Sequence, residues 1–469
     1  MELIRSWVFP SVERIRLASS MTSTDMKRFG EICVLDESPQ TAVADPRAEI
    51  ELLLCCARTS IDSKTLERLR TLLRQDMDWP RLIQMAGSHG VLPLLYRSLS
   101  FCSPDAVPKA VLDRLRESFR SNAQRSLFLT AELHKLLDLF AVHGINVIPF
   151  KGPILAASVY KDLSLRPFGD LDVLVSRDDI LKAGGLLASL GYQPTTGNGV
   201  ALEQDPDPED VAYVGPKFYV FVHRDHGARV DLQWRVTQRY FSFSLEENHG
   251  RGRLVPVMVA GRSVLTFAPM DLLLILCAHG AKHQWQRMKW ICDVAELVST
   301  EKEKIDWGKL QQEASRQGMR RMLSLGLILA RNLLGAELPG EVSKTVERDF
   351  GGGSVVSRIV SKLFTESTEP FGDSERVIFY LRTMDRWQDR VRFCSNYLSQ
   401  CLRDVAIPTS KEHKFFSLPA PLSFLYYFFR PLRLAGKYLW LALSQLSPGK
   451  RSAPVKDSLD SEQSRRDSA

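Results

Sequence analysis

Two aspartates separated by one residue begin an apolar stretch, FGDLDVLV, at residues 168–175. Alternate side chains of a β-strand point to the same face, so Asp170 and Asp172 would share one surface. Leu171 and Val173 would point to the other face, toward a core. Two carboxylates that close repel each other, and the pKa of each would rise unless a cation lay between them. The spacing therefore suggests a divalent metal site on the polar face of a buried strand.

A third carboxylate, Asp231, lies on the polar face of a second predicted strand, RVDLQW, at residues 229–234. Alternation places Arg229 and Gln233 on that same face. Three carboxylates on neighbouring strands could bind two Mg²⁺ ions ~3.5–4 Å apart, an arrangement that stabilises attacking and leaving oxygens in phosphoryl transfer. Mn²⁺ is the alternative ion. An Asp-x-Asp spacing alone also arises by chance, so the neighbouring segments must show whether it marks a metal site.

A phosphate-binding turn is predicted upstream, where the apolar run VIPF ends in Lys151 and Gly152 and a helical pattern follows. Glycine lets the backbone approach a phosphate closely, a helix N-terminus offers free N–H groups, and Lys151 adds positive charge. The plainer alternative is that Gly152 only turns the chain and Lys151 is solvated. Arg166, in SLRPFGD, would clamp a phosphate oxygen or pair with one of the aspartates.

These segments, together with VDLQW and HGAKHQWQRMKWICDVAEL at residues 279–297, resemble a bacterial family known as uncharacterised nucleotidyltransferases. That family belongs to the DNA polymerase β-type nucleotidyltransferase superfamily, and the resemblance extends from about residue 50 to residue 440. It implies an α+β fold, in which a small mixed α/β nucleotidyltransferase domain of the polymerase β type is flanked by N- and C-terminal helical domains.

The resemblance also assigns roles to individual residues. The triphosphate-holding turn falls on Lys151 and Gly152, the metal pair on Asp170 and Asp172, and the third acid on Asp231. The implied reaction is attack of a substrate hydroxyl on the α-phosphate of a nucleoside triphosphate, with release of pyrophosphate. Mg²⁺ would activate the hydroxyl, so no histidine base is required. The acceptor would be a small molecule, a peptide or a protein hydroxyl.

Two other functions stay open. Pro153 follows Gly152 and has no backbone N–H for a phosphate, and Gln233 stands where the family pattern has histidine. A catalytically silent nucleotide sensor or scaffold of the same fold is therefore one alternative. The other is a membrane-surface adaptor, because residues 415–443 are strongly aromatic and basic. Prolines interrupt that segment, so packing against the helical body is the favoured interpretation.

A second polar cluster depends on residues 272–298 forming one helix, which would bring His279, His283 and Asp293 to one face. Two histidines four residues apart can chelate zinc, but no third ligand is apparent. A buried hydrogen-bonded His–Asp pair that fixes helix packing is the commonest explanation. The remaining hypothesis is that His279, Lys282 or His283 reaches the nucleotide or the acceptor.

Hydrophobic periodicity divides the chain into five segments. Apolar residues at three- and four-residue intervals predict an N-terminal helical domain at 46–144. Short β-branched runs predict the α/β domain at 145–265, and helical spacing returns in a C-terminal helical domain at 266–445. Residues 1–45 and 446–469 lack such patterns, which predicts a poorly ordered N-terminus and a disordered tail.

The composition is that of a globular protein, with 469 residues, 44% of them hydrophobic, and a formal net charge of +7. Lysine and arginine are scattered rather than clustered, which permits a nucleotide partner but predicts no specific DNA binding. The eight cysteines form no C-x-x-C pair. The first twenty residues mix charges with apolar side chains, unlike a secretory signal, and we expect a cytoplasmic protein.

Overall fold

The computed structural model describes residues 47–195, 218–236, 253–350, 353–365 and 372–406. By its contacts the chain divides into two compact units, Met1–Arg390 and Val391–Ala469. The predicted N-terminal segment, the predicted tail and the aromatic segment 415–443 lie outside the described residues, so membrane contact stays a prediction. No helix within the described ranges combines the length and apolar character needed to cross a membrane.

The first described part of the chain is helical, as its periodicity predicts. Its elements are α4 (Arg47–Cys56), α5 (Ser63–Leu72), α6 (Trp79–His89), α7 (Leu92–Cys102), η2 (Pro104–Ala106) and α8 (Lys109–Val142). Asp62 caps α5, its carboxylate accepting a hydrogen bond from the Thr65 amide at 2.7 Å. The long helix α8 ends before Gly144, whose φ of +70° is the left-handed conformation that glycine adopts freely.

A five-stranded mixed sheet follows. Its strands are β1 (Ile148–Pro149), β2 (Asp170–Leu174), β3 (Tyr192–Thr195), β4 (Phe218–His223) and β5 (Arg229–Gln233). The spatial order is β1-β2-β5-β4-β3, with β2 and β5 parallel and every other pair antiparallel. Strands β4 and β5, which follow each other in the chain, form an antiparallel hairpin. Helices α9 (Pro153–Ser158) and α10 (Ile180–Ser189) follow β1 and β2, respectively.

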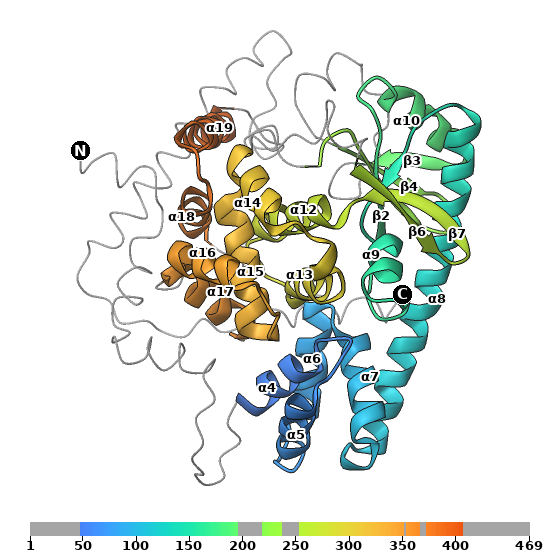
Figure 1. Cartoon of the computed structure of the whole chain (residues 1–469). Coiled ribbons are helices and arrows are strands. Elements are labelled where there is room, and N and C mark those ends of the chain that lie inside the picture. Colours follow the sequence, from blue (N-terminus) through green and yellow to red (C-terminus); the bar gives the residue numbers. More distant parts are fainter. Residues whose placement is uncertain (1–46, 196–217, 237–252, 351–352, 366–371, 407–469) are drawn as a thin grey trace, which may run out of the picture. The chain divides into compact units, whose positions relative to one another are not determined.

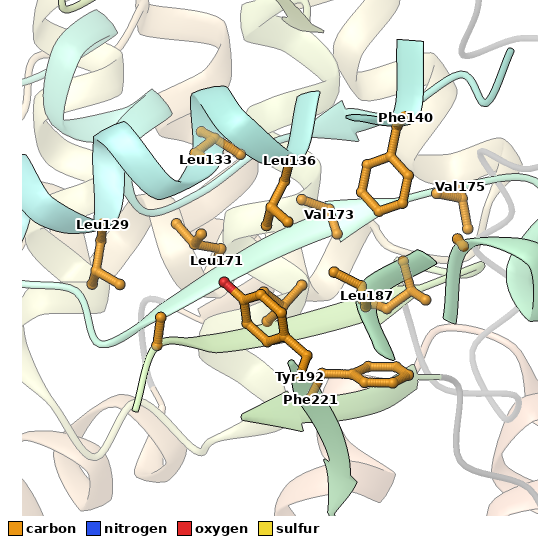
Figure 2. Packing of buried hydrophobic residues seen from close by; sticks show 14 of the residues in the cluster. Leu129, Leu133, Leu136, Phe140, Leu171, Val173, Val175, Leu187, Tyr192 and Phe221 are labelled. Carbon is orange, nitrogen blue, oxygen red and sulfur yellow. The ribbon is translucent and has the colours of Figure 1, made fainter. Parts of the chain in front are cut away.

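The hydrophobic core on one face of this sheet fixes the direction of every side chain in β2. Figure 2 shows Leu171 and Val173 packed beneath Leu133, Leu136 and Phe140 of α8. Full burial of each such aliphatic side chain stabilises the fold by ~1.5–3 kcal/mol, so a register slip that exposed them would be strongly unfavourable. The polar residues of β2 are thereby held on the opposite face.

Two further strands and a set of helices complete the described chain (Figure 1). The strands β6 (Leu254–Val259) and β7 (Arg262–Phe267) form a separate antiparallel pair. The helices are α12 (Pro269–Lys282), α13 (Met288–Glu301), η4 (Lys302–Lys304), α14 (Trp307–Arg316), α15 (Arg320–Leu334), α16 (Gly340–Phe350), α17 (Ser354–Phe364), α18 (Asp373–Thr383) and α19 (Trp387–Ala406). The mixture of helices and small sheets agrees with an α+β fold, while the separate flanking domains stay predictions.

The single helix predicted over residues 272–298 is wrong, because the chain breaks between α12 and α13. Gln284 and Trp285 take positive φ values of +49° and +56° there. The Trp285 indole is fully buried, and a Cβ atom added to Gly280 would lie 2.4 Å from it. Burial of this large ring against a glycine surface offsets the strained backbone, an effect that helical periodicity does not reveal.

Candidate active site

The predicted acidic residues come together on adjacent strands. Asp172 of β2 and Asp231 of β5 are Cα partners in the parallel ladder, and each is 9% exposed. Asp170 lies two residues before Asp172, opposite Arg229, and is partly exposed. The two carboxylates of the registered pair therefore lie on neighbouring strands, whose backbones run ~4.8 Å apart. The sequence predicted that the strands could be neighbours, and the structure fixes their register.

Burial and the proximity of the acids raise the pKa of Asp231. Burial raises the pKa of its carboxyl, and the charges of Asp172 and Asp170 raise that pKa further. Arg229 opposes these effects, because its Nε donates to Asp231 Oδ1 at 2.9 Å and its Nη2 donates to Oδ2 at 3.4 Å. Both oxygens of Asp231 are thus engaged by one guanidinium, a contact that favours the ionised carboxylate.

Asp172 is engaged through a single oxygen. Lys151 Nζ donates to Asp172 Oδ1 at 3.0 Å, and Gln233 Nε2 donates to the same oxygen at 2.7 Å. Lys151 also lies over the Phe150 ring, 4.9 Å from its centroid, and its side chain is only 12% exposed. The lysine of the predicted turn therefore reaches the acidic strands directly.

Gly152 packs that turn against the start of β2. Its φ of +47° is unfavourable for any residue with a Cβ atom, and an added Cβ would lie 3.2 Å from the Asp170 carbonyl oxygen. Helix α9 begins at Pro153 and has only six residues. Because it is short and its first residue lacks an N–H, the turn offers few backbone donors. Its main contributions are close backbone approach and the ammonium of Lys151.

Arg166 has a partner that the sequence did not suggest. Its Nε and Nη2 donate to the two oxygens of Asp293 on α13 at 2.7 and 2.9 Å, and the Tyr160 hydroxyl donates to Oδ1 at 2.9 Å. The expected partners of Arg166 were a phosphate oxygen or an aspartate of the acidic strands. The predicted His–Asp pair is wrong as well, because Asp293 bonds to arginine and tyrosine. This buried network ties the loop before β2 to α13.

The histidines at the end of α12 remain clustered despite the break in the helix. The rings of His279 and His283 are 4.7 Å apart, and His283 stacks on Trp290 at 4.8 Å. Burial, reinforced by nearby lysines, lowers the pKa of His283 to about 3 and that of His279 well below its ordinary value. Both imidazoles are therefore neutral near pH 7, and no zinc-binding third ligand joins them within the described chain.

Two lysines face the acids from these helices. Burial and the charge of Lys151 lower the pKa of Lys282, whereas the charges of Asp172 and Asp231 raise it. Lys282 is therefore close enough to interact with both registered carboxylates.

Lys289 of α13 shows the same balance. Burial and Arg166 lower its pKa, while Asp293 and Asp170 raise it. The sequence did not point to Lys289, because the direction of its side chain depends on the break between α12 and α13. Sequence reasoning also missed Arg229 as a partner, although strand alternation already placed that residue beside Asp231.

The donor set fits one divalent cation. Carboxylate oxygens are the ligands that Mg²⁺ prefers, and among the described residues the Asp170 carboxylate receives no hydrogen bond or ion pair. Asp172 Oδ1 and both oxygens of Asp231 are already engaged. Within the described ranges no three His, Cys, Asp or Glu side chains form a metal-binding group. Asp170 and Asp172 are thus the residues available to a cation.

Comparison with known proteins gives one match. A family model described as uncharacterised nucleotidyltransferase matches residues 75–335, more than half of the chain. Every residue of the site lies within that range. No curated protein and no solved structure matches the chain.

Proposed function

Because the chain belongs to this family of uncharacterised nucleotidyltransferases, we propose that it transfers a nucleoside monophosphate from a nucleoside triphosphate to a hydroxyl acceptor and releases pyrophosphate. The observation that carries the proposal is the registered pair of Asp172 and Asp231 on parallel strands. Like charges this close raise each other's pKa unless positive charge lies nearby, and a divalent cation would add to the charge that Lys151 and Arg229 supply. Mg²⁺ is the cation proposed, with Mn²⁺ as its substitute.

Asp170 and Asp172 would hold the metal ion. When bound, Mg²⁺ supplies charge neutralisation for the phosphates and acidifies a nearby hydroxyl. Asp231 has a raised pKa, which makes its carboxylate the better proton acceptor for the attacking hydroxyl. His279 and His283 are weak proton acceptors for that step, because burial and nearby lysines lower their pKa values.

The triphosphate would lie between the turn and the helices. Lys151 comes from the turn, Lys282 from α12 and Lys289 from α13, so positive charge reaches the acids from three elements. These ammonium groups are partly buried and have lost part of their contact with water. Phosphate oxygens would replace that water, because they accept hydrogen bonds and carry negative charge. Arg166 contributes indirectly, because its pair with Asp293 holds α13 against this region.

A catalytically silent nucleotide sensor is the second candidate, and one observation favours it. Asp172 and Asp231 are already neutralised by Lys151 and Arg229. A site in which the protein's own cations satisfy the acids could bind a nucleotide without turning it over.

Transfer from α-³²P-labelled nucleoside triphosphates separates the two candidates. Each of the four nucleotides would be incubated with Mg²⁺ and pools of small-molecule, peptide and protein hydroxyls, and products would be identified by mass. Asp170→Asn and Asp172→Asn should lose transfer, whereas Asp178→Asn, an exposed carboxylate beyond β2, should keep it. Transfer that survives both site substitutions contradicts the proposed centre. Nucleotide binding without any labelled product supports the sensor.

A further inference from the structure

The contact between Lys151 and Asp172 bears on how many metal ions the site can hold. Given the proposed nucleotidyl transfer, on which this step rests, we infer that the site takes one divalent cation, held by Asp170 and Asp172. The Lys151 ammonium supplies the positive charge that a second ion would bring. The sequence alone predicted two ions on the three carboxylates.

The cations and the amide already bonded to the carboxylates disfavour a second ion in this arrangement. A carboxylate oxygen has about two acceptor directions, and Asp172 Oδ1 uses them for Lys151 Nζ at 3.0 Å and Gln233 Nε2 at 2.7 Å. Each Asp231 oxygen accepts one bond from Arg229, whose positive charge repels a cation at that carboxylate. The carboxylate oxygens that bond to no cation are those of Asp170 and Asp172 Oδ2, which lie on one strand and can share a single ion.

The balance of charge gives the same answer. Three carboxylates face Lys151 and Arg229, which bond to them, and Lys282 and Lys289 add positive charge nearby. One divalent ion would already leave the centre positive, as suits an incoming triphosphate. A second ion would lie beside the Lys151 ammonium, and the repulsion between them is strong in a partly buried site.

The neighbours of Lys151 favour this position of its ammonium. Its ammonium lies over the Phe150 ring, and the next residue, Gly152, is packed against the Asp170 carbonyl in a conformation that only glycine adopts easily. The backbone from which the lysine projects is therefore held at the start of β2, within reach of Asp172. An ammonium has three N–H donors, so two remain for oxygens of the triphosphate after the bond to Asp172.

Counting Mn²⁺ bound to the full-length protein tests the inference without relying on turnover. Equilibrium dialysis with Mn²⁺ alone gives the number of ions, and electron paramagnetic resonance with an added α,β-methylene nucleoside triphosphate reports whether two ions are coupled. Wild type should bind one site-specific ion, defined as the ion lost in Asp170→Asn, and should show no coupled pair. Lys151→Met frees Asp172 Oδ1 and should add a second ion with a coupled spectrum.

The matched control is Lys182→Met, in which an exposed lysine that donates to the His143 carbonyl is lost; it should bind one ion, as wild type does. A coupled Mn²⁺ pair in wild type overturns the inference, as does the absence of an ion that depends on Asp170. A Lys151→Met variant that still binds one ion also overturns the assigned role of Lys151. Failure of the transfer assay with one ion bound would instead refute the proposed reaction alone.

Discussion

Asp172 on β2 lies directly opposite Asp231 on β5 in a parallel ladder, so two buried carboxylates share one face of the sheet. We predict opposite effects of Asp231→Asn on activity and stability. Transfer should fall by ~100-fold or more, since a charged group at the reacting centre is lost. The free energy of unfolding at pH 7 should rise, because the pKa of Asp231 is raised in the folded state and ionisation therefore opposes folding.

Urea unfolding at pH 7 and the labelled transfer assay measure the two effects. Asp178→Asn, in an exposed position, is the control and should change neither quantity. A variant that is both less stable and fully active would show that the registered carboxylate has no catalytic part.

Gly152 is predicted to be irreplaceable by alanine, whereas Gly169 is not. The positive φ of Gly152 and the 3.2 Å approach to the Asp170 carbonyl should make Gly152→Ala cost about 1–3 kcal/mol of unfolding free energy. An added Cβ at Gly169 meets nothing within 4 Å. Denaturant titration of both variants checks the difference, and equal stability of the two would contradict the packing of the turn.

The Arg166–Asp293 pair is predicted to be structural. Arg166→Met leaves Asp293 buried and unpaired except for Tyr160, a change that costs about 3–5 kcal/mol in other buried pairs. Arg166→Lys should restore little stability, because an ammonium cannot make the two-pronged contact.

Arg116→Met is the matched control for that pair, since Arg116 bonds to Asp113 with both side chains about half exposed. Its removal should leave the unfolding midpoint unchanged. Wild-type stability of Arg166→Met, with a selective rise in the KM for nucleotide, would instead support the phosphate contact predicted from sequence.

The sequence could reveal the acids because strand alternation is a local rule. Asp172 and Asp231 each stand between buried apolar neighbours and Asp170 precedes Leu171, so burial of those neighbours determines which way the acids point. The break at Trp285 could not be predicted in the same way. It depends on an indole filling the space beside Gly280, a contact between side chains rather than a period in the sequence.

Partner choice was similarly hidden from the sequence. Arg166 and Asp293 are 127 residues apart in the chain, and only the packing of α13 on the loop before β2 brings them together. The bond between Lys151 and Asp172 was within reach of the sequence, since both residues were assigned to one site. The effect of that bond on metal binding could not be predicted from the sequence, because it depends on which Asp172 oxygen accepts from the lysine.

Asp271, in the first turn of α12, is predicted to make stability depend on pH. The residue is fully buried, and burial raises the pKa of its carboxyl from 3.8 to about 6, with Arg253 opposing the rise. Between these two values the folded state holds a proton that the unfolded state has lost. Stability therefore falls as pH rises through this window, by up to ~3 kcal/mol, and stays lower above pH 6.

Asp271→Asn removes that ionisation, so the variant should gain stability over wild type at pH 8 and lose the gain at pH 4. Thermal unfolding across this range measures it. Asp105→Asn, an exposed carboxylate, serves as the control. A gain for Asp271→Asn that is equal at both pH values would contradict the assigned ionisation.

His279 and His283 are predicted to stay neutral in the folded protein between pH 5 and pH 8. Burial and nearby lysines lower both pKa values, that of His283 to about 3. The imidazole proton resonances, assigned with His279→Gln and His283→Gln, should not shift over this range. In concentrated urea the same rings should titrate near about 6.5. Since the unfolded state gains these protons first, stability should fall as pH drops below about 6.5, and less so in His283→Gln.

A midpoint near pH 6.5 for either folded ring would allow that histidine to exchange a proton with substrate. Rings with such low pKa values are weak bases and leave proton acceptance to the carboxylates, among which burial and neighbouring charges raise the pKa of Asp231.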